Sequence, residues 1–212
     1  MRSATISLLL ALVFIPAIAG AQVIIDHNCT DLSVIPDNFI TQAKQQFRLS
    51  YGHTSHGSQI VTGMEVLGAL PQSIYGFSHD GDDGTLSLHD GEMSGDLGSG
   101  GDLTWEGETR ALLAQSGCDR NMIMWSWCGG VSGNTVEDIN IYLQAMHALE
   151  LDYPNVRFVY MTGHLDGSGV EGNLHQRNEQ IRDWCRTHDK VLFDFADIES
   201  YDPDGSYFLD RY

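Results

Sequence analysis

Short apolar segments alternate with amphipathic helical segments along the second half of the chain, and this alternation restricts the fold more than any other feature. The predicted strands span residues 122–127, 156–161 and 191–195, and the predicted helices span 106–115, 135–153 and 173–188. Short links between such elements are typical of a parallel sheet covered by helices on both faces. The sequence therefore predicts an α/β fold, a three-layer α/β/α sandwich, in a single domain.

The first half of the chain adds one more strand and helix pair. A short amphipathic helix is expected after Pro36, followed by a strand at 47–51 and by a helix carrying Ile60, Val61, Met64 and Leu67 at helical spacing. Residues 76–102 then hold eight glycines and six aspartates, a composition that favours loop over regular structure. We expect a long surface excursion there.

The N-terminus has the order of a secretory signal: Met1-Arg2, an apolar run over residues 6–19, and Ala19-Gly20-Ala21. We therefore predict a signal peptide at 1–21 and a secreted mature domain at 22–212, extracellular or periplasmic. No later segment approaches the roughly 20 apolar residues that a membrane-spanning helix needs, so membrane insertion is not expected.

The net charge and the cysteine count limit which classes of binding partner and which cellular compartment fit this chain. The formal net charge of −18 argues against nucleic acid and anionic lipid as partners. Cys29, Cys118, Cys128 and Cys185 make an even number, which in an exported protein predicts two disulfides. Cys118 and Cys128 flank one predicted strand and are the favoured pair, although a bridge across one extended strand would strain its geometry.

Three polar loops follow predicted strands: GHTSHGSQ (52–59), CGGVSGNT (128–135) and TGHLDGSG (162–169). In open parallel sheets, ligands bind outside the carboxyl ends of the strands. A serine at a tight strand-to-helix turn exposes its hydroxyl there, beside the N–H groups of the helix. Ser55 fits this position as a nucleophile, with Ser58 as the fallback; the alternative is that either serine only caps the helix.

The blocks SYGHTSHG, GSGGDLTWEGETRALL, MIMWSWCGGVSGN and LQAMHALELDYPNVRFVYMTG, in this order, resemble the SGNH (GDSL-type) hydrolase superfamily over most of the mature chain. The resemblance implies a flavodoxin-like parallel sheet and serine esterase chemistry. It also implies Ser55 as nucleophile, with Gly101 and Asn134 in the oxyanion hole. The chain departs from the family pattern in the first block, where His53 and Thr54 replace Gly-Asp.

The general base is the largest departure, because the family's Asp-x-x-His pair does not follow Asp194. Three alternatives stay open: the chain is a piece of a longer protein, another histidine is the base, or the fold has lost the chemistry. His164 is our candidate for a substitute base, since it follows a strand at the same sheet edge, and Asp166 is two residues on. The alternative is a loop histidine without a role.

Metal binding is a second possibility for the polar loops. His53 and His56, joined by His79, His89 or His164, would suit zinc or copper. Calcium would instead use carboxylates in turns, namely Asp80, Asp82 and Asp83, although solvated turns explain them equally well. Of the tryptophans, Trp105 is the candidate for substrate contact.

Two functions are therefore expected from the sequence. The first is a secreted serine hydrolase of carboxylic esters that requires no cofactor and acts on a small ester or an acylated glycan, as in polysaccharide deacetylation. The second is a non-catalytic secreted protein of the same fold that binds glycan or calcium, or acts in assembly.

Overall fold

The computed structural model describes residues 22–202 and 204–208 and contains a seven-stranded, all-parallel sheet in the order β1-β7-β6-β5-β2-β4-β3. Each of the six pairings is parallel, which confirms the predicted fold class. The strands are β1 (Val23–Ile25), β2 (Arg48–His53), β3 (Phe77–Ser78), β4 (Leu86–Ser94), β5 (Met122–Trp125), β6 (Arg157–Met161) and β7 (Val191–Phe193).

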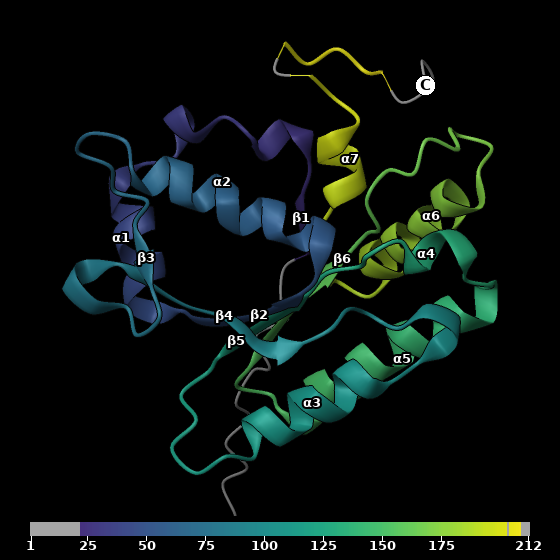
Figure 1. Cartoon of the computed structure of the whole chain (residues 1–212), viewed down its shortest axis with the longest axis horizontal. Helices are drawn as coiled ribbons and strands as arrows, with labels where there is room; N and C mark the ends of the chain where they lie inside the picture. The colour runs from purple at the N-terminus through teal and green to yellow at the C-terminus, as the bar shows by residue number, and fades with distance from the viewer. Residues whose placement is uncertain (1–21, 203, 209–212) are drawn as a thin grey trace, which may run out of the picture.

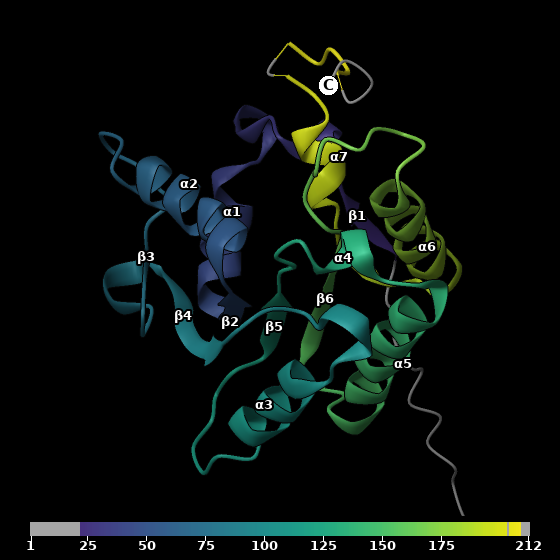
Figure 2. The same ribbon diagram turned by 45° about the vertical axis from the view of Figure 1, so that its right-hand side comes forward.

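Helices cover both faces of the sheet, as Figure 1 shows: α1 and α2 lie on one face, and α3 and α5 lie on the other. Helix α6 packs beside α5 and contacts the short helix α4, an arrangement also visible in Figure 2. The helices are α1 (Asp37–Gln46), α2 (Ser58–Gly68), α3 (Thr104–Leu113), α4 (Gly130–Gly133), α5 (Val136–Asp152), α6 (Asn173–Thr187) and α7 (Phe195–Glu199). The result is a three-layer α/β/α sandwich.

Helix α5 forms where local sequence signals predict it. Thr135 accepts from the backbone N–H of Asp138, and the Asp138 carboxylate accepts from the backbone N–H of Thr135, which completes a capping box. The apolar face of this helix is fully buried against the sheet, with side chains at helical spacing: Ile139, Tyr142, Leu143, Met146 and Leu149. The helix therefore begins where the sequence predicts it.

The expectation of a structureless excursion over residues 76–102 was wrong. The segment contains β3 and the nine-residue strand β4, which pairs with β2 over most of its length. Leu88 and Met93 of β4 are buried in the core, and the buried hydroxyl of Ser87 donates to the carbonyl of His79 and accepts from Arg120. Pairing with a central strand outweighed the unfavourable glycine and aspartate content.

Strand order places a switch point between β2 and β5. From β2 the chain passes to β4 on one side, whereas β5, β6 and β7 follow one another on the other side. The loops that leave β2 and β5 diverge there to opposite faces, and this opens the crevice where doubly wound sheets bind ligands. The loop with Ser55 and the loop with Asn134 border this point.

Several sequence expectations concern features that this structure does not test. The predicted signal peptide, residues 1–21, lies outside the described residues. Within the described residues, no helix has the length and apolar character needed to cross a membrane. All four cysteines are described and unpaired, with Cys185 buried and Cys29 exposed, so the two disulfides stay a prediction.

Candidate active site

The turn after β2 presents Ser55 to solvent in an unusual backbone conformation. Ser55 is exposed and has a φ of 20°, a positive value that non-glycine residues rarely adopt. The chain passes from β2 through the one-turn 3-10 helix Ser55–Gly57 directly into α2. Backbone strain of this kind concentrates at functional sites, and an exposed serine on a sharp strand-to-helix turn is the geometry of a nucleophile.

Gly57 lets this turn pack closely against the end of β5. A Cβ at Gly57 would lie 2.2 Å from the hydroxyl oxygen of Ser126 and 2.9 Å from that of Tyr51. The buried Tyr51 donates to the carbonyl of Gly57 at 3.0 Å, and burial raises the pKa of Tyr51 to about 12. The phenol therefore stays protonated and holds the turn in place.

Asp96, from the loop after β4, fixes the residue before Ser55. Its Oδ1 accepts from the backbone N–H of Thr54 at 2.9 Å, and both carboxylate oxygens lie 2.6 Å from the Thr54 hydroxyl. The next residue, Leu97, donates its backbone N–H to the carbonyl of Ser126. The loop after β4 thus connects the ends of β2 and β5.

The same loop reaches Asn134, so the glycine and asparagine blocks meet. Buried Asn134 accepts from the N–H of Gly100 at 2.7 Å, and its Nδ2 donates to the carbonyl of Gly98 at 3.3 Å. Gly98 is two residues beyond Asp96, a span of at most about 7 Å in extended chain. Ser55 and Asn134 are therefore joined through one short loop at the same sheet edge.

Gly101 lies at the end of this loop with a φ of +76°, which favours glycine. A Cβ at this residue would approach the Ile141 side chain of α5 to 2.9 Å. Both the conformation and the contact require glycine, so the residue that the SGNH resemblance selected has a structural constraint of its own.

The structure brings His164 beside the serine turn through its neighbour His56. The two imidazoles stack with centroids 3.6 Å apart and an interplanar angle of 6°. Nδ1 of His164 lies 2.8 Å from the carbonyl oxygen of Leu165, which can only accept, so Nδ1 carries the proton. Nε2 of His164 then has a free lone pair, as a general base requires.

Glu199, at the end of α7, holds the two histidine loops together. Its Oε2 accepts from the backbone N–H of Leu165 at 2.9 Å, and its Oε1 lies 3.9 Å from Nε2 of His56. The carboxylate thus contacts the residue after His164 and faces the ring stacked on it.

Asp166 has other partners than His164. It accepts from the Ser132 hydroxyl at 2.6 Å and from the backbone N–H of Ser168 at 2.8 Å. Although partial burial acts in the opposite direction, these hydrogen bonds lower the pKa of Asp166 below its ordinary value. The residue ties the loop after β6 to α4 rather than orienting the imidazole.

The residues considered for metal binding are distributed over separate contacts. His53 bonds through Nε2 to Asp90 at 2.6 Å, whereas His56 stacks on His164. The carboxylates of Asp80, Asp82 and Asp83 do not form one of the two groups of converging ligand atoms found among residues 22–202 and 204–208. Those groups are His79, His89 and Glu92, and Asp26, His27 and Asp197.

The expectation that Trp105 contacts substrate was wrong. Its side chain is 1% exposed, and its indole N–H donates to the carbonyl of Asp102. Trp105 lies on α3 against Tyr142 of α5, so its large apolar surface belongs to the core between helix and sheet.

A cavity of 180 Å³ lies next to the candidate site, between α6, α7 and the loop after β6. Leu165 and Asp166 line it, but Ser55 and His164 do not. Ser55 is exposed at the surface beside this cavity.

Asp96 and Glu199 are the parts of the site that sequence reasoning missed, and His56 was considered only as a metal ligand. Asp96 sits in a glycine-rich stretch that had been interpreted as loop, and Glu199 is one acid among several near the C-terminus. Of these three residues, only His56 had a feature in the sequence that placed it at the site, namely its position next to Ser55.

Comparisons with known proteins identify no relative. No family model, no curated protein and no solved structure matches this chain. Its function therefore has to be inferred from the geometry at the carboxyl edge of the sheet.

Proposed function

We propose that this chain is a secreted serine hydrolase of carboxylic esters that resembles the SGNH enzymes, with Ser55 as nucleophile and His164 as general base. The observation that carries the proposal is the stack of His56 on His164. It brings an imidazole with a free Nε2 from the loop after β6 to the residue that follows Ser55. The loops with the serine, asparagine and histidine follow β2, β5 and β6, which are neighbours in the parallel sheet.

In the proposed reaction, Ser55 Oγ attacks the acyl carbon while Nε2 of His164 takes the hydroxyl proton. The protonated imidazole then donates this proton to the leaving alkoxide, which departs as the alcohol. Water next attacks the acyl-enzyme, again with His164 as base, and releases the carboxylic acid and the serine. Glu199 positions the loop that carries His164, because its carboxylate accepts from the backbone N–H of Leu165.

The oxyanion would be held at the glycine and asparagine blocks. Asn134 has two amide N–H groups, and among its described contacts one of them donates to Gly98. The other, with the N–H of Gly101, is our candidate pair of oxyanion donors. Because Gly98 and Gly100 hold the amide of Asn134, its orientation is set before substrate binds.

The exposed position of Ser55 favours an acylated glycan over a small buried ester. The acyl group of a polymer can reach a serine that is exposed at the surface, and the net charge of −18 favours a glycan without strong negative charge. The mechanism uses only residues of the chain and needs no cofactor. Export of the mature chain remains part of this proposal.

A non-catalytic glycan-binding or calcium-binding protein of the same fold is the second candidate. Two observations favour it: no hydrogen bond of the described residues joins Ser55 Oγ to His164, and Asp166 is engaged by Ser132 and Ser168. Catalytic hydrogen bonds are often long before substrate binds, so the first observation does not decide between the candidates.

The test is hydrolysis of an unactivated acetyl ester and of an acetylated oligosaccharide by residues 22–212. Ser55→Ala and His164→Gln should each reduce kcat/KM to background, while Ser58→Ala and His188→Gln keep the wild-type rate. A fluorophosphonate should modify Ser55 and no other serine, as read by mass spectrometry of the digested protein. Retention of the rate in Ser55→Ala, or the absence of any esterase activity and labelling, would reject the enzyme.

A further inference from the structure

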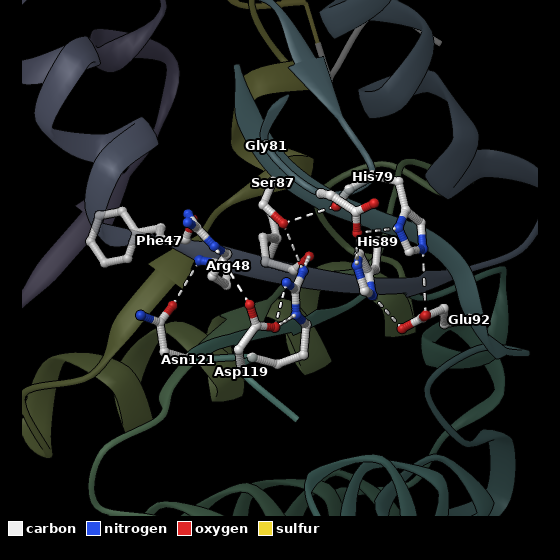
Figure 3. A network of polar contacts seen from close by, with 12 residues as sticks. Phe47, Arg48, His79, Gly81, Ser87, His89, Glu92, Asp119 and Asn121 are labelled. Carbon is white, nitrogen blue, oxygen red and sulfur yellow. Dashed lines mark hydrogen bonds and ion pairs between the residues drawn. The ribbon is translucent and has the colours of Figure 1, made fainter. Parts of the chain in front are cut away.

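Two histidines and two carboxylates meet where β3 and β4 form one lateral edge of the sheet. His79 directly follows β3, and His89 and Glu92 lie in β4. The imidazoles stack with centroids 3.7 Å apart and an interplanar angle of 19°. Figure 3 shows the two rings face to face, with dashed lines from both to Glu92.

Three potential ligand atoms lie on the Glu92 side of the rings. Nε2 of His79 is 3.5 Å from Oε1 of Glu92, and Nδ1 of His89 is 2.5 Å from Oε2. In a tetrahedral zinc site with bonds near 2.0–2.2 Å, ligand atoms are separated by roughly 3.3 Å. The three atoms lie within 4.8 Å of one another, so rotation of the two imidazoles out of their stack would place all three around one ion.

Asp80 lies on the opposite side of the rings, where a supporting carboxylate is needed. Its Oδ1 is 2.9 Å from Nδ1 of His79 and 3.9 Å from Nε2 of His89. The Nε2 atom of His89 is buried without a hydrogen-bond partner. A metal on Nδ1 of His89 would move the proton to Nε2, which then faces Asp80 as a donor.

Asp80 is placed to hold the His79 ring in the tautomer that a metal requires. Nδ1 lies within hydrogen-bond distance of the Asp80 carboxylate, which would keep the proton on Nδ1 when Nε2 binds an ion. The side chain is 59% exposed, so an ion reaches the cluster from solvent. Both imidazoles and both carboxylates thus take part in the candidate metal site.

Backbone geometry explains how Glu92 meets His89. Residues three apart in a regular strand point to opposite faces. Here Tyr51 of β2 pairs with Asp90, but His53 pairs with Ser94, so β4 contains two extra residues. Gly91 takes up the irregularity with a φ of +81°, and the strand bends so that Glu92 turns toward the histidines.

The second converging group, Asp26, His27 and Asp197, is occupied by contacts of its own. Asp197 Oδ2 accepts from both the backbone N–H and the Nδ1 of His27, and the ring stacks on Tyr201 at 3.5 Å. These contacts satisfy the group and attach the N-terminal segment to α7.

We propose that His79, His89 and Glu92 bind one zinc ion, with Asp80 behind the rings orienting both imidazoles. Imidazole nitrogen with a carboxylate suits zinc, whereas calcium prefers an all-oxygen shell. The ion joins β3 to β4 and so fastens the edge of the sheet. It also adds positive charge to residues 49–109, which contain ten acidic residues and no Lys or Arg.

Isothermal titration of chelator-treated residues 22–212 with zinc chloride tests the site. We expect one zinc per chain, a melting temperature that rises with the logarithm of free zinc, and no comparable response to calcium. Cobalt in place of zinc should give the visible absorption of a low-coordinate nitrogen and oxygen site. His79→Ala and Glu92→Gln should each weaken binding at least tenfold, and Asp80→Asn should weaken it about tenfold.

His188→Ala is the matched control, because this histidine lies outside the cluster and contacts only Trp184 and Thr187 among the described residues. It should bind zinc like the wild type. Circular dichroism of each metal-free variant establishes that the fold is kept, and the exposed His79 is the least disruptive position. The proposal is overturned if zinc does not bind, if calcium binds more tightly, or if zinc binding is unchanged in His79→Ala and Glu92→Gln.

Discussion

Loss of one partner of the buried ion pair between Arg182 of α6 and Asp194 after β7 should strongly destabilise the fold. Asp194 accepts from Nε and Nη2 of Arg182 at 2.7 and 2.8 Å, and it also accepts from the Thr162 hydroxyl at 3.0 Å. The side chains are only 10% and 4% exposed. Asp194→Ala would therefore leave the charge of Arg182 buried and unpaired.

The magnitude follows from this burial. Removing one partner of a buried, hydrogen-bonded ion pair costs about 3–5 kcal/mol, because the remaining charge loses its compensation. For a domain of this size, each kcal/mol lowers the melting temperature by roughly 2–4 °C, so the expected fall is about 6–20 °C. Asp194 also accepts from the N–H of Asp197 and so caps α7, the helix that ends with Glu199. Asp194→Ala should therefore leave Glu199 less ordered as well.

Urea denaturation monitored by circular dichroism gives the free energy of unfolding. Arg186→Ala on the same helix is the control, since Arg186 is half exposed and its loss should change stability by no more than about 0.5 kcal/mol. The double variant Arg182→Met/Asp194→Leu should recover much of the loss, because it leaves no unpaired charge. A loss below about 1 kcal/mol for Asp194→Ala, or no recovery in the double variant, would refute the reasoning.

Two further predictions concern glycine packing and alkaline pH. Gly52→Ala should destabilise by about 1–3 kcal/mol, because the new Cβ would lie 2.2 Å from a ring carbon of Trp125. Gly63→Ala in α2 meets no atom within 4 Å and should stabilise by about 0.5–1 kcal/mol; equal effects of the two in urea denaturation would contradict the packing. Burial raises the pKa of Cys185 from 9.0 to about 12, so the folded state favours the neutral thiol. The free energy of unfolding should therefore be constant below pH 9 and fall as the pH rises toward 12. The fall should be smaller in Cys185→Ala. A wild-type free energy of unfolding that stays constant between pH 9 and 12 would argue against this role of the thiol.

Prediction from sequence succeeded where an element depends on signals within its own segment. Thr135 and Asp138 mark the start of α5 because a capping box involves only neighbouring residues, and the helical period of the apolar residues fixes its buried face. Strands β5, β6 and β7 were recognisable for the same reason: strands buried on both faces are continuous apolar runs.

Strand β4 shows where this reasoning fails. Its glycine and aspartate content disfavours a strand, but hydrogen bonds to β2 and the burial of Leu88 and Met93 stabilise it. Those interactions involve residues some forty positions away in sequence, and no local pattern reports them. The prediction for Trp105 was wrong in the opposite sense. Its acidic neighbours in sequence suggested an exposed side chain, but the folded chain buries it.

The sequence by itself determined the α/β class, the main helices, and the three polar loops that follow strands, because periodicity and capping are local properties of the chain. Tertiary structure alone decided the order of the strands and hence which loops meet. It stacked His56 on His164 beside Ser55, and it brought His79 together with His89 and Glu92 where β3 meets β4. The physical reason is that these contacts depend on strand pairing between distant segments, and the free energy of that pairing comes from the assembled sheet and core rather than from any one segment.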